Sequence, residues 1–130
     1  MKYLFPVILV VVVFFFIILC GCGKKEQEFS NIDVSTTPEN IKKGKTLYQV
    51  NCASCHGPEG KGDGPASSIL NPKPRNHTDK TYMDKLSNGR IFDVIKKGGL
   101  IVGFPQMPAN PHLKDEEIKY LVAFVRSITK

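Results

Sequence analysis

Two cysteines and a histidine stand close together near the middle of the chain, in the run Cys52-Ala53-Ser54-Cys55-His56. The thiols are three positions apart, so on a helix they lie about one turn from each other and share a face. Thiolate sulfur and imidazole nitrogen are both metal ligands, and a pair of thiols can also exchange electrons or bond to a cofactor. These residues are therefore the first candidates for chemistry.

Other chemistry at these residues needs partners that the sequence does not offer. A thioredoxin-like dithiol also uses Cys-x-x-Cys, but it needs a βαβ setting, and no strand is predicted. A structural zinc site needs four ligands, and the distant His77 and His112, expected in solvated loops, are not paired at ligand spacing. A disulfide between Cys52 and Cys55 would close a very small loop and would leave His56 unexplained.

The pattern Cys-x-x-Cys-His is the one by which c-type haem is attached. Two thiols one turn apart can add to the two vinyl groups on one edge of a porphyrin. The next residue, His56, then lies under the iron and can supply an imidazole nitrogen. The pattern occurs once, so the sequence predicts one covalent haem c held by Cys52 and Cys55, with His56 as an axial ligand.

The second axial ligand decides what a bound haem can do. Thioether sulfur is a soft ligand that favours ferrous iron and raises the reduction potential. Met107 stands close to Pro105 and Pro108, which restrict the backbone and could present the sulfur with little reorganisation. We expect Met107 to be the ligand, in preference to a bis-histidine haem completed by a distant histidine. Met83 is expected to pack or to lie at the surface.

The start of the chain is typical of an export signal. Met1 and Lys2 give a weakly positive beginning, and residues 7–19 are an unbroken run of Val, Ile, Leu and Phe. The run is just short of the ~20 residues that span a bilayer comfortably. We expect residues 1–21 to be a signal peptide or membrane anchor, and the rest of the chain to lie outside the cytoplasm.

The run Leu19-Cys20-Gly21-Cys22 resembles the lipobox of bacterial lipoproteins. In that family a small residue precedes the cysteine at which the signal is cut and the lipid is attached. The resemblance implies lipidation of Cys22. The alternative is an uncleaved anchor helix with two incidental cysteines. Both interpretations hold the exported part at a membrane, and two or three acyl chains would hold it more firmly than one.

The elements that must position the ligands are predicted to be helices. One begins after Thr37, which can cap it, and another begins after Lys114 with an acidic first turn. Short helices are expected near 79–86 and 89–97. The loop from about 55 to 78 is rich in Gly and Pro, and a loop of that length is unusual unless something else packs it. A haem would do so.

The roughly one hundred residues that follow the predicted signal are enough for one small domain and too few for two. Residues 22–37 are polar, mixed in charge and without period, so we expect a flexible tether there that lets a domain at 38–130 swing between partners. The net charge of +6 could steer the protein towards acidic partners or anionic surfaces, or serve solubility alone. No basic stripe interleaved with aromatics indicates a nucleic-acid partner.

From about Thr37 to Ile128 the chain resembles a class I cytochrome c, with its motifs in family order. After the attachment motif come a Gly-rich stretch at 57–66 and Met107-Pro108, where the family carries its sixth ligand. The resemblance implies an all-α fold in which helices and long loops wrap round one haem.

The family also has a helix crossing, in which a Gly and an aromatic residue of the first helix meet a Leu and an aromatic residue of the last. Gly44 and Tyr48 match the first pair, and Leu121 and Phe124 match the second. Gly44 and Tyr48 are four positions apart and so share a face, and Gly permits close approach of two backbones.

The resemblance also implies partners for the haem site. In the family a proline carbonyl, within a Gly-Pro-x-Leu stretch, accepts the hydrogen bond from the other nitrogen of the proximal histidine. Pro65 matches, although Leu70 comes later than the pattern asks, and Pro72 or Pro74 could replace Pro65. Arg75 could pair with a haem propionate, since a planar guanidinium suits a carboxylate. An Arg75 that is simply exposed is the alternative.

A haem with both axial positions filled by the protein leaves no position for a substrate. The sequence therefore predicts a single-electron carrier rather than an enzyme, tethered to a membrane in a respiratory-type chain with redox proteins as partners. One alternative is a sensing domain in which Met107 yields to a small gas. Another is an electron-entry subunit of a larger respiratory or dehydrogenase complex.

Overall fold

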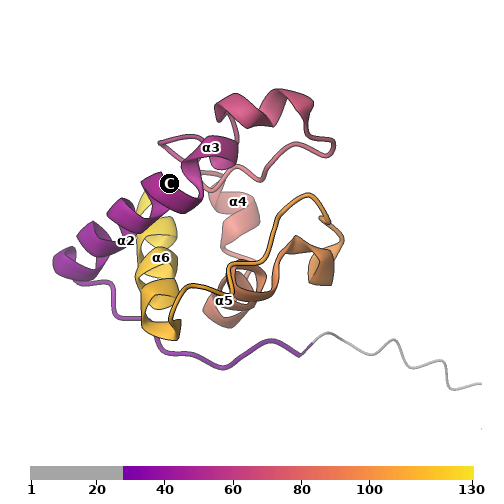
Figure 1. Ribbon diagram of the computed structural model, residues 1–130. Coiled ribbons are helices and arrows are strands. Elements are labelled where there is room, and N and C mark those ends of the chain that lie inside the picture. Colours follow the sequence, from indigo (N-terminus) through magenta and orange to yellow (C-terminus); the bar gives the residue numbers. More distant parts are fainter. Residues whose placement is uncertain (1–27) are drawn as a thin grey trace, which may run out of the picture.

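The computed structural model describes residues 28–130, and these form helices and loops without a strand (Figure 1). In chain order the elements are α2 (Pro38–Asn51), α3 (Ala53–His56), the 3₁₀ turn η1 (Pro65–Ile69), α4 (Lys80–Met83), α5 (Asn88–Lys97), the 3₁₀ turn η2 (Gly99–Val102) and α6 (Asp115–Ile128). The predicted all-α fold is confirmed. The helix expected near 79–86 is a single turn, since it ends at Met83.

The two long helices begin at the positions predicted from the sequence. The hydroxyl oxygen of Thr37 accepts a hydrogen bond from the backbone N–H of Asn40 at 3.3 Å, and Pro38 occupies the first turn of α2. At the start of α6 the Glu117 carboxylate accepts from the backbone N–H of Lys114 at 2.8 Å. Both caps satisfy amide groups that the helices leave without a partner.

Helices α2 and α6 cross in close contact and form the centre of the fold (Figure 1). Gly44 makes the approach possible, because a Cβ atom there would run into the backbone carbonyl of Tyr120. One turn further on, the rings of Tyr48 and Phe124 pack with centroids 4.9 Å apart, and Leu121 is fully buried. The crossing predicted from these residues is confirmed.

Arg126 on α6 fixes the chain between α4 and α5. Its guanidinium donates to the carbonyls of Met83, at 2.9 Å, and Leu86, and to the side-chain oxygen of Asn88 at 2.8 Å. Burial lowers the pKa of the Arg126 guanidinium. Three carbonyl-type acceptors on one half-buried cation hold α4 and α5 in a set position against α6.

Residues 28–36, here called the N-terminal strap, lie along the domain instead of hanging free (Figure 1). Ser30 donates to the Asp93 carboxylate of α5 with its backbone N–H and with its hydroxyl, both at 2.8 Å. Ile32 and Val34 pack against the core. Gly89 leaves room for the strap, since a side chain there would meet the Ser30 carbonyl. This corrects the predicted flexible tether, whose residues 28–36 belong to the folded domain.

The predicted signal at 1–21, Cys22 and the first residues of the predicted tether lie outside the described residues. Within residues 28–130, no helix combines the length and apolar character needed to cross a membrane.

Replacing Gly44 with Ala should destabilise the domain. Ala is ordinarily the better helix former, but the added methyl must push α6 away, and overpacking of this kind costs about 1–3 kcal/mol. The free energy of unfolding, measured by denaturant titration followed by circular dichroism, should fall accordingly. Lys45→Ala, at an exposed position of the same helix, is the control. A Gly44→Ala protein as stable as wild type would contradict the role given to this crossing.

The strap should contribute stability in a pH-dependent way. Burial acts to raise the pKa of Asp93, but the two hydrogen bonds from Ser30 and the Lys97 ammonium at 3.1 Å outweigh it and hold that pKa below its ordinary value of 3.8. A carboxyl whose pKa is lower in the folded than in the unfolded protein stabilises the fold at any pH above its ordinary, unfolded pKa. This stabilisation is lost as the pH falls through the pKa of the carboxyl in the folded protein.

Asp93→Asn should therefore lower the free energy of unfolding at pH 6, and the difference from wild type should shrink below about pH 4. Ser30→Ala should act in the same direction, by about 1.5–3 kcal/mol for one hydrogen bond to a charged group. Glu59→Gln, which breaks an exposed ion pair with Lys61, is the control. A difference between Asp93→Asn and wild type that is the same at pH 3 and pH 6 would contradict this account.

Candidate haem-binding site

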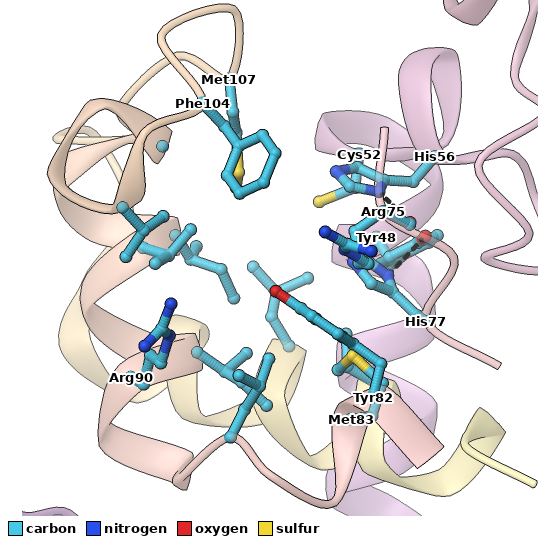
Figure 2. A pocket seen from close by; sticks show the side chains of 18 residues that line it. Tyr48, Cys52, His56, Arg75, His77, Tyr82, Met83, Arg90, Phe104 and Met107 are labelled. Carbon is cyan, nitrogen blue, oxygen red and sulfur yellow. Dashed lines mark hydrogen bonds between the residues drawn. The ribbon is translucent and has the colours of Figure 1, made fainter. Parts of the chain in front are cut away.

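An apolar cavity opens between α3 and the loop that follows η2 (Figure 2). His56 and Cys52 stand on one side and Met107 and Phe104 on the other (Figure 2). Aliphatic side chains from three segments, the turn after α4 and the helices α5 and α6, form much of its wall: Leu86, Ile91, Val94, Ile95, Leu121 and Val125. Such a cavity suits a large, flat and mostly apolar ligand.

A second cavity adjoins the first on the side of the cysteines. The two share Cys52, His56, Ile95, Phe104 and Met107, and the second is also lined by Cys55. The four residues predicted to attach or ligate a haem, which come from sequence positions 52 to 107, therefore line these two adjoining cavities.

The turn of α3 presents the two thiols and the imidazole together. Helix α2 ends at Asn51, and the backbone N–H groups of Cys55 and His56 both donate to the carbonyl of Cys52, at 3.2 and 2.9 Å. Both thiols are free. Burial, with a smaller effect of Cys55, raises the pKa of the Cys52 thiol to about 12, so this thiol is neutral in its apolar surroundings.

His56 is buried and fixed in one tautomer. Its Nδ1 lies 3.0 Å from the carbonyl oxygen of Arg75, and because a carbonyl can only accept, Nδ1 carries the proton. Burial lowers the pKa of His56, and the hydrogen bond to Arg75 offsets part of that effect. A neutral ring that donates from Nδ1 keeps its lone pair on Nε2, which is the form that ligates a metal.

The sequence analysis predicted that the Pro65 carbonyl accepts the hydrogen bond from His56, and this prediction is wrong. In the structure the acceptor is the Arg75 carbonyl. The reason is the path of the loop: the backbone N–H of Gly64 donates to the carbonyl of Cys55 at 3.2 Å, so the chain at Pro65 is held against α3. The Pro65 carbonyl instead lies 3.5 Å from the Ser68 hydroxyl.

Met107 is carried by a loop that folds back on η2. Gly99 donates its backbone N–H to the Met107 carbonyl at 2.9 Å, Phe104 donates to the Gly99 carbonyl at 2.9 Å, and Met107 donates to the Phe104 carbonyl at 3.1 Å. Figure 2 shows the Met107 side chain across the cavity from His56 and Cys52. Met83 is buried in the wall of the same cavity, as expected for a packing residue.

His77 lies against His56, although the sequence analysis expected a solvated loop position. The two imidazoles are stacked, with centroids 4.2 Å apart and planes 22° apart. Burial lowers the pKa of His77 to about 3, with smaller contributions from His56 and Arg75, so its ring is neutral at ordinary pH. His77 stands on the His56 side of the cavity (Figure 2). The sequence held no periodic signal for it, because it lies in an irregular loop.

His112 and Arg75, which the sequence analysis considered as a haem ligand and a propionate partner, lie apart from the centre of the cavity. His112 is exposed, and its Nε2 is 3.2 Å from the side-chain oxygen of Asn51. The Arg75 guanidinium lies 3.8 Å from the centroid of the Tyr82 ring and 5.6 Å from that of Phe104, on the wall of the first cavity.

The residues present fit a haem bound through thioether links. A neutral imidazole and a thioether sulfur face the space from opposite sides, and two free thiols stand on its edge. These are the donors that c-type haems use. The walls are apolar, and the cations of Arg75 and Arg90 stand among them, where they could pair with carboxylates.

Comparison with known proteins agrees with this fit. A family model described as Cytochrome c matches residues 41–129. The chain is 27% identical over 105 residues to the cytochrome bc1 complex cytochrome c subunit of Corynebacterium efficiens, an alignment that covers 79% of this chain and 31% of that protein.

Among solved structures the fold is similar to the reducing HAO-like protein complex Kustc0457/Kustc0458 of Kuenenia stuttgartiensis, with a TM-score of 0.61 and 25% identity. That match covers 82% of this chain and 53% of the other. The chain thus spans about a third of the curated relative and about half of the structural one.

The family match takes in most of the folded domain, including the Cys-x-x-Cys-His turn and the Met107 loop. The helical fold and the donor set of the cavity agree with it. This chain belongs to the cytochrome c family, whose members hold haem c covalently and use it for electron transfer.

Proposed function

We propose that this chain is a single-electron carrier that uses one covalently bound haem c, with His56 and Met107 as its axial ligands. The observation that carries the proposal is the cavity itself. The thioether of Met107 faces His56, whose Nε2 is free, across an apolar space edged by Cys52 and Cys55. The bound haem would supply a one-electron couple between ferric and ferrous iron.

The protein residues act on that couple by ligation, orientation and exclusion of water. The Arg75 carbonyl orients His56, and the three backbone hydrogen bonds of the 99–107 loop hold Met107 in place. Ligands that are held in place need little rearrangement when one electron is added or removed. The apolar walls and the soft sulfur of Met107 favour the less charged, ferrous state, so we expect a high potential within the c-type range.

A second arginine supports a role for Arg75 in holding the propionates. Arg75 and Arg90 both line the cavity. The Arg75 guanidinium is supported on the Tyr82 ring and the Arg90 guanidinium lies 5.0 Å from the centroid of the Phe29 ring, in the strap. We assign the propionates to this pair, since a guanidinium pairs well with a carboxylate.

The relatives and the first residues of the sequence support a proposal for the partners and the location of the protein. The curated relative is named as a subunit of a cytochrome bc1 complex, and the structural one is a reducing HAO-like protein complex. These names support redox proteins as donor and acceptor, whether the chain works as a free carrier or as a subunit. We place it on the extracytoplasmic side of a membrane, anchored through a lipid on Cys22 or through an uncleaved N-terminal helix.

Met107→Ala should open the sixth coordination position while the haem stays attached. The midpoint potential should fall by an appreciable part of the ~0.8 V range that axial ligands set, and the reduced protein should bind carbon monoxide readily. Potentiometric titration and optical spectra with and without carbon monoxide measure both effects.

Met83→Leu is the matched control, because Met83 lines the same cavity and the exchange nearly conserves volume. That variant should keep the wild-type potential and should stay indifferent to carbon monoxide. If the wild-type reduced protein itself binds carbon monoxide readily, the sixth position is open, and the carrier proposal gives way to a sensing or catalytic role.

The cysteines should contribute to attachment separately. Cys52→Ala and Cys55→Ala should each keep one thioether link and shift the absorption band of the reduced pyridine complex to longer wavelength, because each leaves one vinyl group unsaturated. The double variant should lose the haem on a denaturing gel stained for haem. Retention of haem on that gel by the double variant would refute attachment at this pair.

A further inference from the structure

Two contacts bear on the orientation of the His56 ring, one at its edge and one on its face. The edge contact is the hydrogen bond from Nδ1 to the Arg75 carbonyl at 3.0 Å. The face contact is the stacked ring of His77, 4.2 Å away and 22° from parallel. Arg75 and His77 are two residues apart, so one short segment of chain makes both contacts.

His77 is itself held at three points, which come from three different parts of the domain. Its backbone N–H donates to the Gly60 carbonyl at 2.7 Å, and its carbonyl accepts from the Thr129 hydroxyl at 3.0 Å. Its Nδ1 lies 3.2 Å from the hydroxyl of Tyr48, a fully buried residue of α2. The two backbone hydrogen bonds fix the His77 main chain, and the contact with the Tyr48 hydroxyl holds its ring, which cannot swing away without breaking that contact.

Either contact alone leaves His56 some freedom of movement. A single hydrogen bond at Nδ1 fixes the direction of that atom, but the ring can still rock about the bond and about its link to the backbone. A stacked ring on one face removes the rocking motion on that side. The hydrogen bond and the stack together define a plane for the His56 ring.

We propose that His77 is a positioning residue that, with the Arg75 carbonyl, locks the plane of the His56 imidazole when His56 ligates the haem iron. The inference rests on the proposed function, since it assumes that His56 is an axial ligand. His77 acts from the same side as His56 and is not a ligand itself (Figure 2). Tyr48 supports it by fixing the His77 ring.

The orientation of an axial imidazole can be read directly in the oxidised protein. In a low-spin ferric haem protein, the proton resonances of the four ring methyl groups are spread by an amount and in an order that depend on the direction of the axial ligand planes. A ring held in one plane gives a wide spread, whereas a rocking ring gives a narrower one. This readout does not depend on electron-transfer activity.

The test compares these resonances in the full-length haem-loaded protein and in variants at His77. In His77→Ala the stack is gone, so the spread of methyl shifts should narrow or change its order, with the haem still attached. His77→Phe keeps an aromatic face against His56 but loses the contact with the Tyr48 hydroxyl, so its methyl shifts should lie between those of wild type and His77→Ala. His112→Ala removes an exposed histidine that does not touch the cavity, and should match wild type.

Tyr48→Phe removes only the oxygen that holds the His77 ring, and should change the spread in the same direction as His77→Ala but by less. If His77→Ala does not take up haem, this milder variant decides the question. Wild-type methyl shifts in His77→Ala, or in Tyr48→Phe when the Ala variant takes up no haem, would overturn the positioning role. Absence of low-spin ferric signals from the wild-type protein would instead overturn the proposed axial ligation, so the two failures can be told apart.

Discussion

The close crossing of α2 and α6 is the constraint on which the rest of the structure depends. With no side chain at Gly44, the two backbones approach closely enough for Tyr48 and Phe124 to pack beside them. Helix α3 continues directly from α2, so the crossing also sets where the thiols and His56 stand. Arg126 of α6 binds the carbonyl of Met83, which lines the cavity, and Thr129, the residue after α6, donates to the carbonyl of His77. The close approach of the two helix backbones at Gly44 thus positions most of the site.

Around this crossing, two long loops carry the remaining residues of the site. The long stretch between α3 and α4 leaves α3, turns at η1 and returns so that Arg75 and His77 meet His56. The loop after η2 carries Met107 to the other side of the cavity. Loops of this length are costly to order unless they pack on something. Here part of each packs on the helical core, and the apolar cavity between them is matched to a covalent haem.

Much of the site could be predicted because its chemistry depends on local spacing. Cys52, Cys55 and His56 are fixed relative to one another by one helical turn, and the helix caps at Thr37 and Lys114 are equally local. The prediction that Pro65 orients His56 was wrong because it relied on a short motif, whereas the path of this loop depends on contacts with distant residues. The strap was interpreted as a tether for a similar reason: its polar sequence does not reveal that Ser30 meets a buried Asp93.

The sequence by itself determined the helices, the attachment turn and the family, since each depends on residues that are near neighbours along the chain or that follow a helical period. Only the tertiary structure decided which carbonyl orients His56, that His77 stacks on it, and that the strap packs on α5. These contacts join residues that are 19, 21 and 63 positions apart. No periodicity links such positions. They meet because the α2–α6 crossing and the two long loops bring them together, and that outcome depends on the packing of the whole domain.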